Sequence, residues 1–174
     1  MNRSIVWDAS PLIHAGKVDR LDVLGELAKG PAEEPWHNHT TAAVIEELSE
    51  HGCAQPEWTK VVHVDHIQEL TALGAWLDRV ATTTHSKGEA TVFAWAEIHQ
   101  AVAIVDDAEA RRVAQSYGLE VHGLLWVVAL AVQQERWGES SASALVGQLL
   151  ASGARYPFEP GGFGEWARKR GLLS

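Results

Sequence analysis

The fold is decided by the stretch Ser4-Ile5-Val6-Trp7-Asp8-Ala9-Ser10. A short apolar run that ends in a carboxylate and a hydroxyl is typical of a buried strand that delivers polar groups at its carboxyl end, and Pro11 then ends the strand. In an open α/β sheet, ligands bind outside these carboxyl ends, so Asp8 is expected at a position suited to chemistry. A second run of the same design, residues 101–105, ends in Asp106 and Asp107. Two strands that end in acids predict one acidic pocket.

Strands alternate with helices along the rest of the chain. Further strands are expected near Trp36, at 61–64 and at 119–121, and helical spacing of apolar residues recurs at 18–28, 44–48, 67–80, 89–98, 110–117, 124–132 and 140–150. This alternation predicts an α/β fold with a parallel sheet that is covered on both faces. Residues 156–174 contain two prolines and a Gly-Gly pair, so we expect a loosely held tail with at most one helical turn.

Length and composition set limits on the class of protein. A chain of 174 residues that is 46% apolar is long enough for one core and too short for two domains. Cys53 is the only cysteine, which excludes an internal disulfide and fits a reducing compartment. No secretory signal and no apolar run of membrane-spanning length is present, so a cytoplasmic protein is expected.

The formal net charge of -9 argues against a general binder of polyanions, because non-specific binding to nucleic acid depends on Lys and Arg. An acidic enzyme can still act on nucleic acid if divalent metals offset its carboxylates and its few basic residues cluster. The basic clusters are residues 111–112 and 168–170, which we interpret as solvated surface.

Four segments carry acids at the expected ends of strands or helices: Asp8, Glu46 with Glu47, Glu89, and Asp106 with Asp107. Sets of oxygen ligands suit hard ions such as Mg²⁺ or Mn²⁺. Converging carboxylates repel one another, so a pocket that gathers several of them favours a bound cation. Such an ion can generate a hydroxide nucleophile and stabilise a phosphoryl displacement. Ser10 could hold a metal-bound water or fix Asp8 by a hydrogen bond.

Each acid taken alone also has a structural explanation. Asp8 and Ser10 could end a strand and cap a helix, and Glu47 could be solvated helix surface. Glu89 gains from the dipole of its helix whether or not it binds anything. Asp106 and Asp107 could form a turn. The metal hypothesis therefore depends on the combination.

The ordered motifs resemble those of the PIN domain family. The first is Asp8-Ala9-Ser10-Pro11-Leu12-Ile13, the second residues 44–48, the third Gly88-Glu89-Ala90, and the fourth residues 105–114. Residues 118–125 also resemble the ending found in a prokaryotic branch similar to VapC-type toxin ribonucleases. The resemblance spans residues 4 to about 135.

The resemblance implies a metal-dependent ribonuclease with a three-layer α/β/α fold and a mostly parallel central sheet. Residues 1–138 would be the nuclease domain, and residues 139–174 a C-terminal helical extension and tail of the same domain. The acids carried over as catalytic and metal-binding residues are Asp8, Glu47, Glu89 and Asp107, with Ser10 as a polar companion. Glu47 fits better than Glu46 because the acid of the family motif directly precedes Leu. Asp107 fits the family spacing better than Asp106, which would be an auxiliary ligand.

Histidines and tryptophans support no separate site. His37 and His39 have no second pair at ligand spacing, so a structural zinc site is not predicted. His14 lies near the first motif and could face the pocket, but a surface histidine is the favoured interpretation. Tryptophans 7, 95 and 126 are expected in the core. Tryptophans 36, 58, 137 and 166 are expected at element edges or loops, where a subunit contact is favoured over stacking on bases.

Our hypothesis is an Mg²⁺- or Mn²⁺-dependent endoribonuclease acting on RNA. It could be the toxin of a toxin–antitoxin pair, with a small antitoxin protein as partner and a homodimer as the assembly. A catalytically inactive module of the same family that binds RNA or protein is the alternative; the low basic content favours it and the complete acid set disfavours it. A receiver-type phosphoacceptor domain fits less well, because its paired acids follow the first strand and a lysine closes its site.

Overall fold

The centre of the protein is a parallel β-sheet, seen in a computed structural model that describes residues 3–81 and 87–174. In this part of the chain the sheet has five strands in the order β3-β2-β1-β4-β5, and every neighbouring pair is parallel. The strands are β1 (Arg3–Trp7), β2 (Trp36–Thr41), β3 (Lys60–Val62), β4 (Val102–Ile104) and β5 (Val121–His122). The predicted α/β class with a parallel sheet is confirmed.

Strand β1 lies at the middle of the sheet because its sequence can be buried on both faces. Ile5, Val6 and Trp7 are all 0% exposed, as expected for a continuous apolar run in a parallel sheet. From β1 the chain first crosses to β2 and β3 on one side, and later returns to β4 on the other side. The strand order therefore reverses between β1 and β4, which is where open α/β sheets form their ligand crevice.

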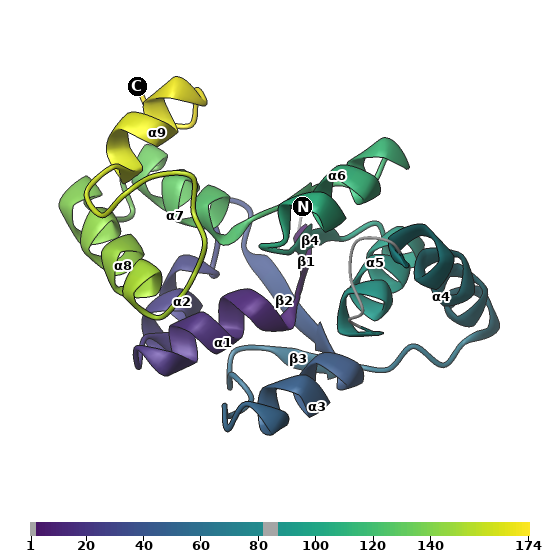
Figure 1. Cartoon of the computed structure of the whole chain (residues 1–174). Helices are drawn as coiled ribbons and strands as arrows, with labels where there is room; N and C mark the ends of the chain where they lie inside the picture. Colours follow the sequence, from purple (N-terminus) through teal and green to yellow (C-terminus); the bar gives the residue numbers. More distant parts are fainter. Residues whose placement is uncertain (1–2, 82–86) are drawn as a thin grey trace.

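Helices cover both faces of the sheet. They are α1 (Ala9–Lys17), α2 (Leu21–Leu27), α3 (Ala42–Glu50), α4 (Ile67–Val80), α5 (Lys87–His99), α6 (Ala108–Ser116), α7 (Leu124–Gln133), α8 (Glu139–Ala151) and α9 (Phe163–Lys169). Figure 1 shows α4 and α5 on one side of the sheet and α1, α2, α7 and α8 on the other, which gives the expected three layers. Among the described helices, none is both long and apolar enough to cross a membrane.

Helix α5 is the element most enclosed by the fold. Residues 88–96 are buried without interruption, and the helix packs against β1, β2 and β4 on its inner side and against α4 on its outer side. A helix that is apolar all round is expected in such a position. Its first turn consequently lies close to the carboxyl ends of the central strands.

The C-terminal segment differs from the loosely held tail that its prolines and glycines predict. Helix α9 packs against α8, which in turn packs against α7. Phe163 and Ala167, one helical turn apart, are 1% and 0% exposed, and Arg168 donates two hydrogen bonds to Glu139 at 2.9 and 2.7 Å. The expectation was wrong because three buried positions in a helix of seven residues leave too weak a periodic signal to recognise.

Replacing Phe163 with Ala should lower the free energy of unfolding by about 3–5 kcal/mol, because it removes a buried aromatic side chain and leaves a cavity. The measurement is urea unfolding of the full chain. Glu165→Ala is the control, since that exposed residue contributes only a surface ion pair with Lys169 and should change stability by less than about 0.5 kcal/mol. Equal stability of Phe163→Ala and the wild type would show that the tail is not held.

Candidate functional site

A cavity of about 500 Å³ lies at the carboxyl ends of β1 and β4. The six residues singled out from the sequence line this one cavity: Asp8, Ser10, Glu47, Glu89, Asp106 and Asp107. Among the residues that the structure describes, His14, Ala108, Gly153, Ala154, Arg155 and Tyr156 also line it. We call it the acidic cavity.

Asp8 is the most enclosed of these acids. It directly follows β1, its backbone N–H donates to Ile104 O at 3.0 Å, and the residue is 3% exposed. Its Oδ1 atom is buried and has no hydrogen-bond partner within residues 3–81 and 87–174. Burial raises the pKa of Asp8 well above its ordinary value, and the negative charges of Glu89, Glu47 and Asp106 raise it further. Without a cation, the ionised form of Asp8 is therefore disfavoured.

Asp106 follows β4, next to β1 in the sheet. Its Oδ1 accepts a hydrogen bond at 2.8 Å from the N–H of Leu124, the first residue of α7. A Cβ atom on Gly123 would lie 3.2 Å from this oxygen, so a glycine allows the close approach. Arg111 donates to the carbonyl oxygens of Val105 and Asp106 at 2.8 and 2.6 Å and holds the turn. Burial nevertheless raises the pKa of Asp106, although the Leu124 N–H and the Arg111 charge oppose the shift.

Glu89 is held in place by a buried link between two helices. It lies in the first turn of α5 and is 6% exposed. Thr91, on the same turn, donates to Gly88 O at 2.7 Å and bonds to the hydroxyl of Thr41, also at 2.7 Å. Thr41 is the N-cap of α3, where its oxygen accepts from Val44 N–H at 3.3 Å. The start of α5 is thereby tied to the start of α3.

Helix α3 brings Glu47 to the acidic cavity, while its neighbour Glu46 is exposed outside it. The choice of Glu47 over Glu46 in the sequence agrees with this placement. Glu47 is half-buried and acts on the pKa of Asp8, so it belongs to the same electrostatic group.

Asp107 has a different role from Asp106 in the local structure. Its Oδ1 accepts from Ala110 N–H at 2.8 Å and caps α6, and the residue is exposed at the rim of the cavity. The groups that shift the pKa of Asp8 include Asp106 and do not include Asp107. Spacing alone favours Asp107 as the fourth acid, whereas burial and electrostatics favour Asp106.

The donor set fits a hard divalent cation. The charged side chains that shift the pKa of Asp8 are all carboxylates, and one buried Asp8 oxygen has no partner among the described residues. The oxygens do not form a tight cage: in the described part of the chain, three potential ligand atoms within 4.8 Å of one another occur only at Asp65, His66 and Glu69. Repulsion among the acids opposes a closer approach in the absence of a cation.

The close approach within the group of Asp65, His66 and Glu69 is explained by their position at the start of α4. Glu69 Oε2 accepts from the N–H groups of Asp65 and His66 at 3.1 Å, as in a capping box. Glu69 Oε1 bonds to His99 Nε2 at 2.6 Å. Asp65 and His66 are exposed. The carboxylate at its centre thus already has partners within the protein.

The interpretation of His14 as a surface residue was wrong. It is half-buried, lines the acidic cavity, and has Nδ1 2.9 Å from Ser152 Oγ. Burial lowers its pKa, which favours the neutral imidazole. The spacing of Ser10 and His14, one turn apart on α1, was the signal that could have placed both at the cavity. Tyr156 also lines the cavity, and no local sequence pattern indicated this placement. Burial and the charge of the adjacent Asp106 raise the pKa of Tyr156.

The raised pKa of Asp8 predicts an unusual effect of Asp8→Asn. The unfolded chain loses the Asp8 proton near the ordinary value of 3.8, while the folded chain keeps it to higher pH. The stability of the wild type therefore falls as pH rises through this window. Without metal at pH 7, Asp8→Asn should raise stability by about 1–2 kcal/mol, or roughly 2–8 °C in melting temperature, with little effect near pH 3.

Thermal unfolding at both pH values checks this expectation, with the exposed acid variant Asp65→Asn as control. Mn²⁺ should raise the melting temperature of the wild type and of Asp65→Asn, and much less that of Asp8→Asn, because the ligand stabilises only a fold that binds it. A destabilising effect of Asp8→Asn at neutral pH would show that burial does not disfavour the ionised carboxyl.

Comparison with known proteins agrees with this geometry. A family model described as a PIN domain matches residues 4–159, which is most of the chain and extends past residue 138. No curated protein matches the chain. PIN domains are generally nucleases and usually bind divalent metals; the closer resemblance to the VapC-type branch stays a prediction. The chain belongs to the PIN domain family.

Proposed function

We propose that this protein is a metal-dependent endoribonuclease that hydrolyses RNA phosphodiester bonds with Mg²⁺ or Mn²⁺. The observation that carries the proposal is the Asp8 carboxyl, buried among three other carboxylates with an oxygen that no described group satisfies. Burying such a group destabilises the fold, and a function of the site would account for it. Family membership supports phosphodiester hydrolysis as that function.

Asp8, Glu89 and Asp106 would hold the cation, with Glu47 as a further ligand on the α3 side of the cavity. A bound Mg²⁺ or Mn²⁺ supplies an activated water and offsets the charge that develops on the phosphate. Ser10, at the start of α1, would orient the Asp8 carboxyl or a water molecule. His14 presents a half-buried imidazole, held by Ser152, to the same space. Asp107 would keep the β4–α6 turn in shape through its cap on α6.

The rival proposal is a catalytically inactive member of the family that binds RNA or protein. The net charge of -9 and the looseness of the acid set favour it. The cost of keeping Asp8 buried favours the enzyme, because a purely structural site gains nothing from five acids in one cavity. The nuclease proposal has two further parts, which come from the resemblance to the toxin branch. A small antitoxin protein would block the acidic cavity, and the protein would assemble as a homodimer.

Cleavage of a mixed single-stranded RNA pool in Mn²⁺ tests the enzyme. Asp8→Asn and Asp106→Asn should each lower the rate at least about 100-fold, because losing a metal ligand removes roughly 3 kcal/mol or more of transition-state stabilisation. Chelation of the metal should have the same effect on the wild type.

Asp107→Ala is the matched neighbour in this experiment. It should cost about 1 kcal/mol of stability through loss of the α6 cap and should change the cleavage rate only a few-fold. If Asp107→Ala abolishes cleavage and Asp106→Asn does not, Asp107 is the ligand. If Asp8→Asn folds normally and cleaves RNA as fast as the wild type, the proposed metal-dependent cleavage at Asp8 is refuted.

A further inference from the structure

A second cavity, of about 510 Å³, adjoins the acidic cavity. The two share Asp106, Ala108, Arg155 and Tyr156 in their walls, so they meet along these residues. The wall of the second cavity comes from α6, β5, α7 and α9, together with the segment before α9. We call it the arginine cavity. Nothing in the proposed chemistry of the acids uses it.

Positive side chains are concentrated in this cavity, although the chain as a whole has a net charge of -9. Arg111, Arg155 and Arg170 all line it. Within the described residues, neither Arg155 nor Arg170 forms an ion pair with a carboxylate, whereas the adjacent Lys169 is paired with Glu165 at 2.6 Å. Arg155 is exposed and lines both cavities, so this residue lies at their junction. Guanidinium groups are well suited to phosphate oxygens.

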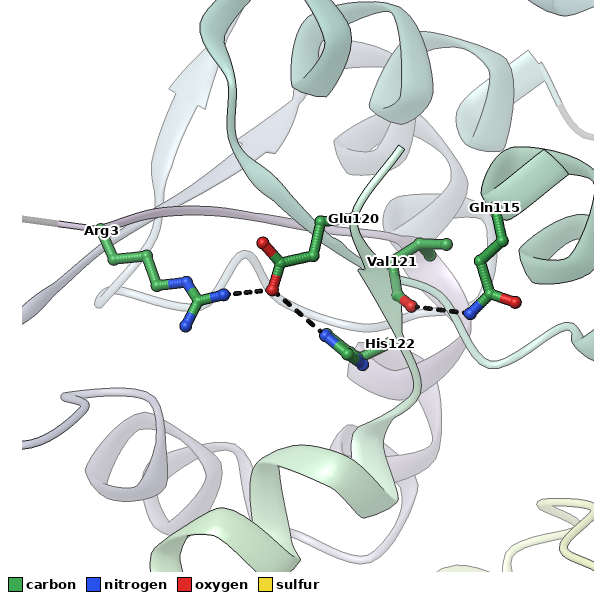
Figure 2. A network of polar contacts seen from close by, with 5 residues as sticks. All are labelled: Arg3, Gln115, Glu120, Val121 and His122. Carbon is green, nitrogen blue, oxygen red and sulfur yellow. Dashed lines mark hydrogen bonds and ion pairs between the residues drawn. The ribbon is translucent and has the colours of Figure 1, made fainter. Parts of the chain in front are cut away.

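Two stacked aromatic rings lie in one wall of the arginine cavity. The rings of His122 and Trp126 are stacked, with centroids 4.0 Å apart and an angle of 7° between their planes. Figure 2 shows how His122 is held: its Nε2 lies 3.3 Å from an oxygen of Glu120, which also pairs with Arg3. Gln115, at the other side of β5 in Figure 2, donates to Val121 O at 3.3 Å. The strand that carries His122 is thus held from both sides.

Trp166 of α9 also lines this cavity. Its indole Nε1 is buried and lacks a hydrogen-bond partner within the described part of the chain. The guanidinium of Arg170 lies 5.8 Å from the centre of its ring. Leaving such a donor without a partner is costly in a folded protein, so a ligand with acceptor atoms fits this wall. The sequence pattern favoured a subunit contact for Trp166; its place in the cavity favours a ligand.

We propose that the arginine cavity binds one unpaired nucleotide of the RNA, next to the phosphate that is cleaved. The base lies against the rings of His122 and Trp166, and the backbone phosphate contacts Arg155 and Arg170. Stacking on aromatic rings and charge contacts to phosphate are the usual means of holding single-stranded nucleic acid. This proposal rests on the proposed function, because only an RNA running through the acidic cavity continues into this one.

Binding can be measured separately from cleavage in the Asp8→Asn background, by fluorescence anisotropy of a labelled single-stranded RNA hexamer. Arg170→Gln is compared with Lys169→Gln, which removes the same charge from the next residue but not from the cavity wall. Arg170→Gln should weaken binding roughly 5- to 10-fold and reduce the slope of log affinity against log salt by about 0.7. Lys169→Gln should leave the affinity within about twofold of that of the parent and should leave the salt slope unchanged.

A second test uses the same assay, but it leaves the cavity residues unaltered and changes the RNA instead. An abasic site is moved through the hexamer one position at a time, and removal of one particular base should weaken binding at least roughly fivefold, as expected for a lost stacking contact. A duplex of the same sequence should bind more weakly than the single strand.

Three results would each overturn nucleotide binding in the arginine cavity. They are equal effects of Arg170→Gln and Lys169→Gln on RNA binding, no loss of binding at any abasic position, and tighter binding of polyglutamate than of RNA. These outcomes are separate from failure of the proposed function, which would appear as continued RNA cleavage by Asp8→Asn. If Asp8→Asn loses cleavage while Arg170→Gln and Lys169→Gln bind RNA equally well, the proposed nuclease function stands and nucleotide binding in the arginine cavity is refuted.

Discussion

The structure depends on the burial of a carboxyl group where two central strands end. Asp8 follows β1 and is 3% exposed, Asp106 follows β4 and is partly buried, and both line one cavity with further acids. Their burial disfavours the charged state and makes this point of the fold costly. The surrounding structure holds them there through rigid backbone contacts: the N–H of Leu124 on Asp106, and the pairing of β1 with β4. A divalent cation converts the same arrangement from a cost into a binding site.

The uneven distribution of charge reconciles an acidic protein with the polyanionic substrate that we propose. The acidic cavity would repel RNA if it were empty of metal, and the arginine cavity beside it carries uncompensated positive charge. Under the proposal, a cation in the first cavity and a phosphate in the second would make the two cavities one continuous path for RNA. The net charge of -9 therefore excludes a general nucleic-acid binder and still allows a local RNA site.

Much of the fold and of the acid set was predictable because both depend on local patterns. The apolar run before Asp8 and the run before Asp106 indicate buried strands, and the PIN motifs give the order of the acids. The distinction between Asp106 and Asp107 was not predictable, since it depends on which side chain caps α6 and which meets the N–H of Leu124. The arginine cavity was also hidden, because residues 155–172 reach it only through the packing of α8 and α9.

Anomalous diffraction from crystals grown with Mn²⁺ tests the central claim most directly, because it locates the cation without reference to activity. We expect one strong peak in the acidic cavity, within ligand distance of Asp8, Asp106 and Glu89. A peak at Asp65, His66 and Glu69 instead, or no peak at the ends of β1 and β4 at millimolar Mn²⁺, would contradict the claim that the buried carboxylates exist to hold a metal ion.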